Sequence, residues 1–355
     1  MFAVNAYTIP TIAPESDGTA EWDATTLVTV HVGDGFGYTY ADESTALFIA
    51  KHFGDMQFDP LSPEAAWKEM IAKVRNLGRR GVAAMAISAV DAALWDWKCK
   101  LLDVPLCKLL GQVRDAIPVY NSGGFTSMSI DELQEALAGW PRVKMKVGRD
   151  WRADRERVSA VRNAIGPEAE LFVDANGAYT RKLALWQAEA FAEDGVTWFE
   201  EPVSSDDLEG LRFIRERTPI EIAAGEYGYE LQYFDEMIAA GAVDVLQADA
   251  TRCTGITGFI KASALCESRS IPLSSHCAPS LHAHLGCALL PMRHLEYFFD
   301  HVRIERQLFD GFVEATNGEI RPDLSRPGLG VAFKQQDAER LSSSQIGRAS
   351  CRERV

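Results

Sequence analysis

The chain has 355 residues, of which 47% are hydrophobic and 25% charged, as in an ordinary globular protein. This length accommodates two domains, or one large barrel with an addition. The net charge of −15 disfavours nucleic acid and anionic membranes as partners, because their phosphates would be repelled. Seven cysteines without CxxC pairing indicate reduced thiols and a cytoplasmic location. The sequence shows neither a signal peptide nor a membrane-spanning segment.

The first elements are strands. The polar, turn-rich stretch 14–22 is predicted to be an exposed loop. Two apolar runs, 27–32 and 36–40, flank the turn Gly33-Asp34-Gly35, which predicts an antiparallel hairpin. A phosphate-binding loop is the alternative, but no helix follows Gly37.

Helices follow this hairpin. Ser62-Pro63 combines a helix-capping residue with a proline at the first helical position. Residues 83–102 are rich in alanine and predict a long helix. A hairpin followed by helices predicts that residues 1–114 form an α+β domain.

From residue 117 onward, strand-like runs alternate with helix-length segments such as 154–165 and 181–194. The strand-like runs are 117–121, 143–147, 171–175, 196–200, 220–224, 243–249, 271–276 and 294–299. Repetition of this unit predicts a closed parallel barrel over residues 115–309. An open doubly wound sheet is the alternative, but it typically offers one ligand crevice and not a polar residue at nearly every strand end.

The residues after the barrel have weaker patterns. Residues 310–341 contain several turns and few apolar side chains, and we expect them to pack back on the N-terminal domain. Residues 342–355 lack apolar periodicity and are predicted to be a disordered tail. Residues 345–355 resemble a translated sequencing adapter, so we expect them to be non-native.

Three carboxylates recur at a constant spacing, each at the end of a strand-like run. They are Asp174, Glu200 and Glu226, with 200 − 174 = 26 and 226 − 200 = 26. In a barrel, the carboxyl ends of all strands meet at one mouth, so these side chains can surround a single ion. A ligand set made of oxygen atoms alone favours Mg²⁺ over zinc.

Other ionisable residues end the flanking strands. Lys144 and Lys146 share one strand face, and each ammonium is expected to depress the pKa of the other, so that one can act as a general base. His276 and Asp249 end neighbouring strands, where the carboxylate would fix the tautomer of the ring. Glu296 ends the eighth strand and could donate a proton or hydrogen bond to a substrate oxygen.

Together these motifs resemble the mandelate racemase subgroup of the enolase superfamily. The motifs are SAVDAALWDWKCKLLDVPLCKLLGQ, VKMKVG, VDANGAY, WFEEPV, IAAGE, QADATRCTGITG, SSHCAPSLHAHLG and RHLEYF. The resemblance covers nearly the whole native chain. It implies an α/β fold with a modified (β/α)₇β TIM barrel and an N-terminal α+β capping domain, and it suggests a homo-oligomer.

The resemblance also implies roles for the strand-end residues. These are Mg²⁺ binding by Asp174, Glu200 and Glu226; base catalysis by Lys146, with Lys144 modulating it and contacting the substrate carboxylate; acid/base catalysis by His276 with Asp249; and an electrophilic contribution from Glu296. The expected chemistry is removal of the proton next to a carboxylate, through an enediolate stabilised by Mg²⁺.

Two outcomes of this chemistry are open. We favour dehydration of an acid sugar to a 2-keto-3-deoxy acid, because the loop at 14–22 is polar and lacks the apolar wall that an aryl substrate needs. Racemisation or epimerisation of a 2-hydroxy acid or acid sugar is the alternative, and a barrel that binds metal and ligand without turnover is a remote third. Candidate substrate-binding residues are Glu15, Asp17, Trp22, Asn176 and Arg252, with Ser16 and Glu21 in the same loop.

Overall fold

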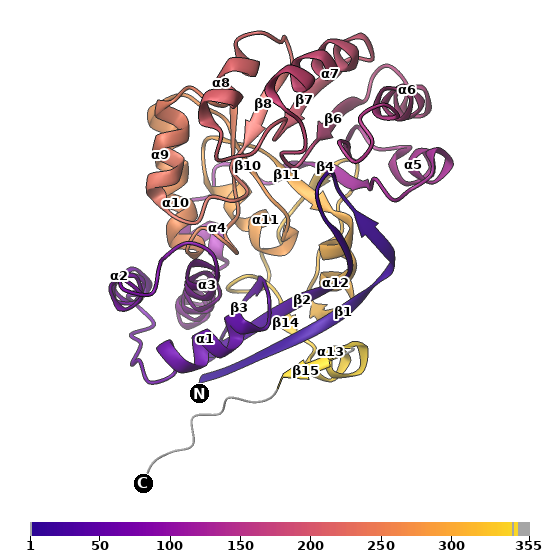
Figure 1. Ribbon diagram of the computed structural model, residues 1–355. Helices are drawn as coiled ribbons and strands as arrows, with labels where there is room; N and C mark the ends of the chain where they lie inside the picture. Colours follow the sequence, from indigo (N-terminus) through magenta and orange to yellow (C-terminus); the bar gives the residue numbers. More distant parts are fainter. Residues whose placement is uncertain (1, 343, 347–355) are drawn as a thin grey trace.

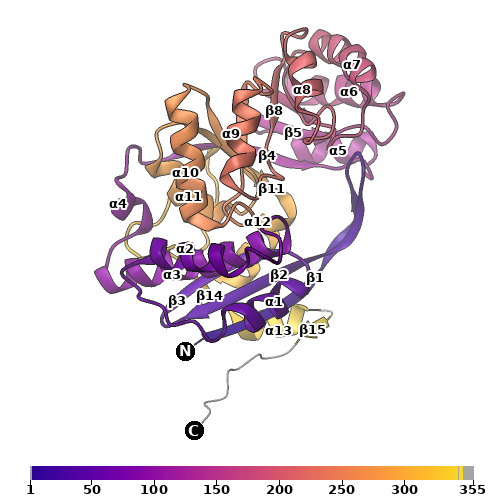
Figure 2. The same ribbon diagram turned by 60° about the vertical axis from the view of Figure 1, so that its left-hand side comes forward.

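The computed structural model describes residues 2–342 and 344–346. An N-terminal antiparallel sheet with its helices lies against one end of a barrel that is surrounded by helices (Figure 1). Figure 2 shows that the hairpin formed by β1 (Phe2–Ser16) and β2 (Glu21–Val32) extends from this sheet along the barrel towards α5 (Ile130–Leu137). No helix in the described part of the chain combines the length and apolar character needed to cross a membrane.

The N-terminal sheet has the strand order β15-β1-β2-β3, in which β15 (Ser344–Ile346) comes from the end of the described chain. Its elements and the helices that follow are β1 (Phe2–Ser16), β2 (Glu21–Val32), β3 (Gly35–Tyr40), α1 (Ser44–Phe53), α2 (Pro63–Lys73), α3 (Val82–Leu102) and α4 (Leu106–Leu110). The predicted hairpin is confirmed, since β2 and β3 pair antiparallel around Gly33, whose φ is 58°. The predicted helices are also present, and α2 begins at Pro63.

The prediction of an exposed loop at 14–22 was wrong for part of this stretch: residue 14 and residues 19–21 are exposed, but the residues between them are not. β1 continues to Ser16 and β2 begins at Glu21, and Glu15, Ser16 and Asp17 are buried. The tip of this hairpin rests on the loop after the first barrel strand, where Thr126 N donates to Ser16 O at 2.9 Å. The hairpin packs against the barrel and buries these polar residues with their hydrogen bonds made: Ser16 Oγ bonds Thr126 Oγ1 across the contact at 2.6 Å, whereas the Glu15 and Asp17 carboxylates accept hydrogen bonds from within the hairpin.

Eight parallel strands close the barrel. They are β4 (Ile117–Gly124), β5 (Arg142–Lys146), β6 (Glu170–Asp174), β7 (Val196–Glu200), β8 (Glu221–Ala224), β9 (Val245–Ala248), β10 (Leu273–Ser275) and β11 (Met292–Phe298). The intervening helices are α5 (Ile130–Leu137), α6 (Asp154–Ile165), α7 (Arg181–Glu193), α8 (Leu208–Arg215), α9 (Leu231–Ala239), α10 (Gly255–Ser268) and α11 (Pro279–Ala288). The predicted barrel is confirmed, because β11 pairs with β4, a contact that an open sheet would lack.

Inward-facing residues form two layers inside the barrel. The lower layer contains the rings of Tyr120, Phe172 and Trp198, with Phe172 and Trp198 stacked at 5.3 Å. Because side chains alternate along a strand, the residues two positions after Phe172 and Trp198 face inward again. These residues are Asp174 and Glu200, so the carboxylates lie on an apolar floor that excludes water.

A buried carboxylate links the N-terminal sheet to the barrel. Glu305 lies on α12 (Phe299–Leu308), the helix after the last barrel strand. Its Oε1 accepts hydrogen bonds from the hydroxyls of Tyr38 at 2.9 Å and Tyr40 at 3.2 Å, and its Oε2 accepts one from Ser280 N. Burial raises the pKa of Glu305 to about 7, although these donors oppose the shift.

This environment predicts that Glu305 makes stability depend on pH. Its folded pKa lies above its ordinary value of 4.5, so its contribution is complete below pH 4.5 and is lost as pH rises through about 7. Between pH 4.5 and 8, the unfolding free energy of the wild type should fall by up to roughly 3 kcal/mol more than that of Glu305→Gln. Urea unfolding at several pH values measures this difference. The exposed Glu209→Gln is the control, and equal pH profiles for wild type and Glu305→Gln would contradict the prediction.

The segment after the barrel contains β12 (Phe309–Asp310), β13 (Glu319–Ile320), β14 (Ala332–Phe333) and α13 (Gln335–Leu341). Phe333 stacks on Phe36 of the N-terminal sheet at 5.6 Å, and its ring lies 5.4 Å from that of Tyr7. The division of the chain at residues 114, 309 and 341 stays a prediction.

The predicted disordered tail requires a correction over three residues. β15 (Ser344–Ile346) pairs antiparallel with β1, because β1 is otherwise the open edge of the sheet. Residues 343 and 347–355 lie outside the described part of the chain. The non-native origin of 345–355 stays a prediction.

Candidate active site and metal centre

The three spaced carboxylates meet at the mouth of the barrel. Asp174 ends β6 and pairs in register with Glu200 at the end of β7, so both lie at one level. Glu226 follows Gly225, whose φ is 133° and where a Cβ would lie 2.1 Å from Gln247 O, so only glycine fits this turn. Asp174, Glu200 and Glu226 can each offer an oxygen within 4.8 Å of the others, and all three are buried.

The electrostatics of this group fit a divalent cation. Burial and the charge of Asp174 raise the pKa of Glu200 well above its ordinary value, which shows how costly several buried carboxylates are together. Glu226 Oε2 is buried and has no hydrogen-bond partner among the described residues. Three converging oxygen ligands, one of them unsatisfied, suit a hard cation such as Mg²⁺.

The two lysines of β5 occupy different positions. Lys144 is completely enclosed, with Nζ 2.6 Å from Glu200 Oε1 and 2.8 Å from Glu296 Oε1. Lys146 lies two residues further along β5, at the carboxyl end of the strand. Its Nζ is 2.5 Å from Asp174 Oδ2, and its side chain lines the cavity at the mouth of the barrel. Lys146 can therefore reach a substrate, whereas Lys144 neutralises the carboxylates beneath it.

The lowered pKa that the sequence predicted for one of the two lysines is not found, because the pKa values of both are raised. Burial alone would lower the pKa of Lys146, and so would Lys144. The attraction of Asp174, together with Glu226 and Glu200, outweighs both effects and raises the pKa of Lys146. The carboxylates that favour a cation therefore also hold the proton on Lys146.

His276 and Asp249 form a hydrogen-bonded pair on the other side of the mouth. His276 Nδ1 lies 2.8 Å from Asp249 Oδ2, and its Nε2 lies 3.5 Å from Glu226 Oε2. Burial would raise the pKa of Asp249, but the hydrogen bond and charge of His276 outweigh burial and lower it. An ionised Asp249 fixes the ring so that Nε2 faces the cavity.

Glu296 lies between Lys144 and His276 and contacts both side chains. Its Oε1 contacts Lys144 Nζ, and its Oε2 accepts a hydrogen bond from Cys277 N at 2.9 Å. Burial would raise the pKa of Glu296, but Lys144 and His276 lower it well below its ordinary range. In this environment Glu296 is an acceptor, and its predicted role as a donor to substrate stays a prediction.

A cavity of about 330 Å³ connects these groups with the N-terminal hairpin. Its lining combines residues from both parts of the chain: Asp17, Trp22, Ala24, Thr25, Thr26, Tyr40, Ala41, Asp42, Lys146, Asn176, Glu226, Tyr227, Arg252, His276, Cys277, Glu296, Phe298 and His301. Most of these side chains can form hydrogen bonds, which suits a polar ligand.

Four of the five predicted substrate-binding residues line this cavity, namely Asp17, Trp22, Asn176 and Arg252. Glu15 does not, because its Oε2 accepts a hydrogen bond from Trp22 Nε1 at 2.9 Å and so holds that ring in place. Their contacts with a substrate stay predictions.

Several residues of the site were missed from the sequence. Tyr227 and Cys277 directly follow site residues, and Phe298 lies two positions after Glu296 on the same strand, so adjacency and strand period could have indicated them. His301 comes from α12 and had no such signal. Glu201 was also missed: it is 1% exposed, has φ of 38°, and burial raises its pKa well above the ordinary value.

Comparisons with known proteins identify relatives over most of the chain. A mandelate racemase/muconate lactonizing enzyme-like protein from Rubrobacter xylanophilus is 52% identical and has a TM-score of 0.92, covering 96% of this chain and 98% of that one. The 3,6-anhydro-alpha-L-galactonate cycloisomerase of Streptomyces coelicolor is 34% identical over 90% of this chain and 92% of its own length.

A third relative is the L-talarate/galactarate dehydratase of Salmonella typhimurium, which is 32% identical over 85% of this chain and 78% of its own length. Its crystal structure, liganded with Mg and L-lyxarohydroxamate, superposes with a TM-score of 0.88 at 29% identity, covering 97% of this chain and 93% of that one.

Two family descriptions also match. "Mandelate racemase / muconate lactonizing enzyme, N-terminal domain" matches residues 19–111, and "Enolase C-terminal domain-like" matches residues 129–338. The chain therefore belongs to the mandelate racemase/muconate lactonizing enzyme group of the enolase superfamily.

Proposed function

We propose that this protein is a Mg²⁺-dependent dehydratase that removes water from an acid sugar and yields a 2-keto-3-deoxy acid. One observation carries the proposal: Lys146 and His276 line one cavity, Asp249 holds the ring of His276, and the cluster of three carboxylates contacts both groups, through Asp174 at Lys146 and Glu226 at His276. Around the barrel, β5 and β10 are separated by β4 and β11 on one side and by β6 to β9 on the other. The two groups therefore approach a bound substrate from opposite walls.

Asp174, Glu200 and Glu226 would hold Mg²⁺. Bound there, the ion supplies positive charge that stabilises an enediolate and offsets the carboxylates that hold the proton on Lys146. The relative liganded with Mg supports this cofactor.

The chain's own groups account for the proton transfers. The amine of Lys146 takes the proton from the carbon next to the substrate carboxylate. His276, protonated at Nε2 and oriented by Asp249, gives its proton to the hydroxyl on the β-carbon, which leaves as water. The resulting enol tautomerises to the 2-keto acid. Lys144 and Glu296 keep the charges of the mouth paired during these steps.

The lining of the cavity supports a polyhydroxylated acid as substrate. Asp17, Thr25, Asn176 and Arg252 offer donors and acceptors to hydroxyl groups, as a sugar chain requires. The dehydratase from Salmonella typhimurium supports the same reaction class.

Racemisation or epimerisation is the second candidate. It is favoured by the same pair of facing groups, because one can remove the proton and the other can return it on the opposite face. The cycloisomerase relative supports an isomerase. A binding-only barrel is less well supported, since both proton-transfer groups reach the cavity. A cytoplasmic location and a homo-oligomeric state stay predictions.

A library of aldonic and aldaric acids with Mg²⁺ tests these alternatives. A product that reacts with semicarbazide supports dehydration. Deuterium incorporation at the α-carbon without a keto product overturns dehydration and supports the isomerase. If neither occurs on any acid while a ligand still raises the melting temperature, the protein binds without turnover.

A further inference from the structure

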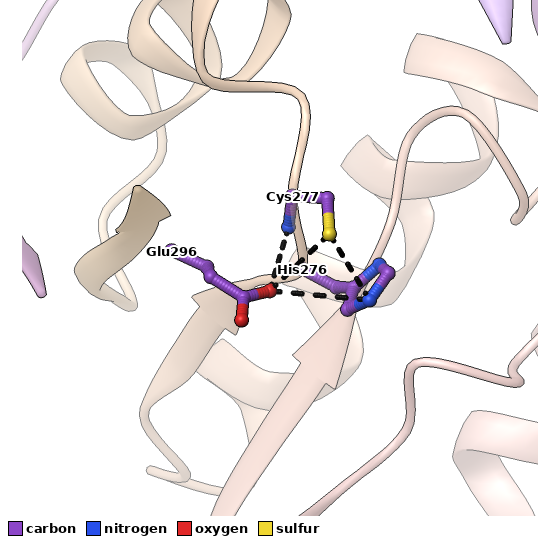
Figure 3. Close-up of side chains that lie close together, drawn as sticks. All are labelled: His276, Cys277 and Glu296. Carbon is purple, nitrogen blue, oxygen red and sulfur yellow. Dashed lines mark hydrogen bonds and ion pairs between the residues drawn. The ribbon is translucent and has the colours of Figure 1, made fainter. Parts of the chain in front are cut away.

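The proposed reaction leaves one buried thiol at the mouth of the barrel unused. Cys277 is 3% exposed and lines the cavity directly after His276. Figure 3 shows its sulfur pointing towards the ring of His276 and the carboxylate of Glu296. Sγ lies 3.2 Å from His276 Nε2 and 3.5 Å from Glu296 Oε2, and the nitrogen lies 3.9 Å from that oxygen.

These three atoms form a donor set different from that of the carboxylate centre. Nitrogen, sulfur and one carboxylate oxygen are the ligands that Zn²⁺ takes, whereas Mg²⁺ prefers oxygen alone. For Zn²⁺ bonds of about 2.0–2.3 Å, a tetrahedron places neighbouring ligand atoms roughly 3.3–3.6 Å apart. Of the three observed separations, 3.5 Å lies within this range, 3.2 Å just below it and 3.9 Å above it, so side-chain shifts of a few tenths of an ångström would complete such a site.

The surroundings of the three donors also match a metal site. Zinc-bound histidines usually donate their other ring nitrogen to a carboxylate, and His276 Nδ1 is already paired with Asp249. The other carboxylate oxygen of Glu296, Oε1, forms an ion pair with Lys144 Nζ at 2.8 Å, which fixes the orientation of the carboxylate. All three donors line the cavity, which leaves a fourth position open to water or to an oxygen of the substrate.

We propose that His276, Cys277 and Glu296 form a second cation site, specific for thiophilic divalent ions such as Zn²⁺. Binding displaces the thiol proton to solvent and occupies Nε2 of His276. An ion at Nε2 blocks the proton transfer assigned to His276, so Zn²⁺ inhibits the enzyme; this consequence rests on the proposed function, whereas binding does not. The site differs from the Mg²⁺ centre in its ligands and in the strands that carry them.

Binding is tested with Co²⁺ alone as a spectroscopic probe, in the presence of excess Mg²⁺ to fill the oxygen site. A Co²⁺–thiolate bond produces charge-transfer absorption in the near ultraviolet, which oxygen ligands do not produce. We expect this band to saturate at one Co²⁺ per chain and to disappear when Zn²⁺ is added. The band should be absent in Cys277→Ala, or in Cys277→Ser if the alanine variant does not fold.

Cys266→Ala is the matched control, because Cys266 is a buried cysteine on α10, away from the mouth. This variant should keep the band. No band in the wild type, or an equal band in the Cys277 variant, would overturn the proposal.

Inhibition is a separate readout. On an acid that the enzyme turns over, the Zn²⁺ concentration for half-inhibition should rise about 10–100-fold in Cys277→Ala relative to Cys266→Ala. Equal inhibition of both variants would refute a role for the thiol. If no acid is turned over, the proposed function fails while the Co²⁺ band still decides whether the site exists.

Discussion

Replacing Lys146 by alanine is expected to slow exchange of the substrate α-proton by about 10²–10⁴-fold, and His276→Asn should slow formation of the keto product by a factor of the same order, because His276 protonates the leaving hydroxyl. Lys146 is the lysine of β5 that lines the cavity, and His276 faces it from the opposite wall. Each variant removes one proton-transfer group and leaves the three carboxylates in place. On an acid identified in the library, deuterium incorporation at the α-carbon, measured by NMR, provides the exchange rate, and the product that reacts with semicarbazide provides the rate of dehydration.

The exposed Lys182 on α7 and the half-buried His52 on α1 offer matched controls, as Lys182→Ala and His52→Asn, and both variants should react at the wild-type rate because neither residue lines the cavity. An unaffected Lys146→Ala enzyme would leave His276 as the only base and would disprove the two-sided arrangement. If His276→Asn keeps exchange but loses the keto product, His276 acts on the leaving hydroxyl alone, which supports dehydration over racemisation.

The second large effect concerns the metal centre. Chelation of divalent ions should lower turnover by about 10²-fold or more, and Mg²⁺ should restore it, because the charge on the enediolate would otherwise be uncompensated.

Glu226→Gln removes one ligand charge with little change in shape, and this variant should lose both turnover and stabilisation by Mg²⁺. At 100 times its dissociation constant, Mg²⁺ should stabilise the wild type by about 2.7 kcal/mol, measured by thermal unfolding.

Glu216→Gln, which changes an exposed carboxylate on the outer surface, should behave like the wild type in both measurements. Equal stabilisation of the wild type and Glu226→Gln by Mg²⁺ would place the ion elsewhere. Full activity after exhaustive chelation would remove the metal from the mechanism.

Local patterns in the sequence were sufficient for the barrel. Each strand run is short, apolar and followed by a helix-length segment, and all eight predicted runs overlap the observed strands. The carboxylates were found because each one ends or closely follows a strand. The carboxyl ends of parallel barrel strands meet at one face, independently of loop length and conformation. The same reasoning placed Lys146, Asp249 and His276 at the mouth.

Predictions that depended on the environment of a residue were less successful. The hairpin tip at 14–22 is polar, so it was predicted to be exposed, but packing on the barrel buries Glu15 and Ser16. Each of the two lysines was predicted to lower the pKa of the other. The carboxylates contributed by β6, β7 and the loop after β8 instead raise the pKa of Lys146. Residues 344–346 were predicted to be disordered, but they form a strand that pairs antiparallel with the edge strand β1.

The sequence by itself determined the fold class and the positions of the strand-end carboxylates, because hydrophobic periodicity and residue spacing are local properties. Only the tertiary structure decided that Lys144 is enclosed between Glu200 and Glu296, that Glu15 contacts Trp22 without reaching the cavity, and that Cys277 lies beside His276 and Glu296. These outcomes depend on how distant strands and the N-terminal hairpin pack together. Packing sets burial, distance and charge, and these three quantities decide what an ionisable side chain can do.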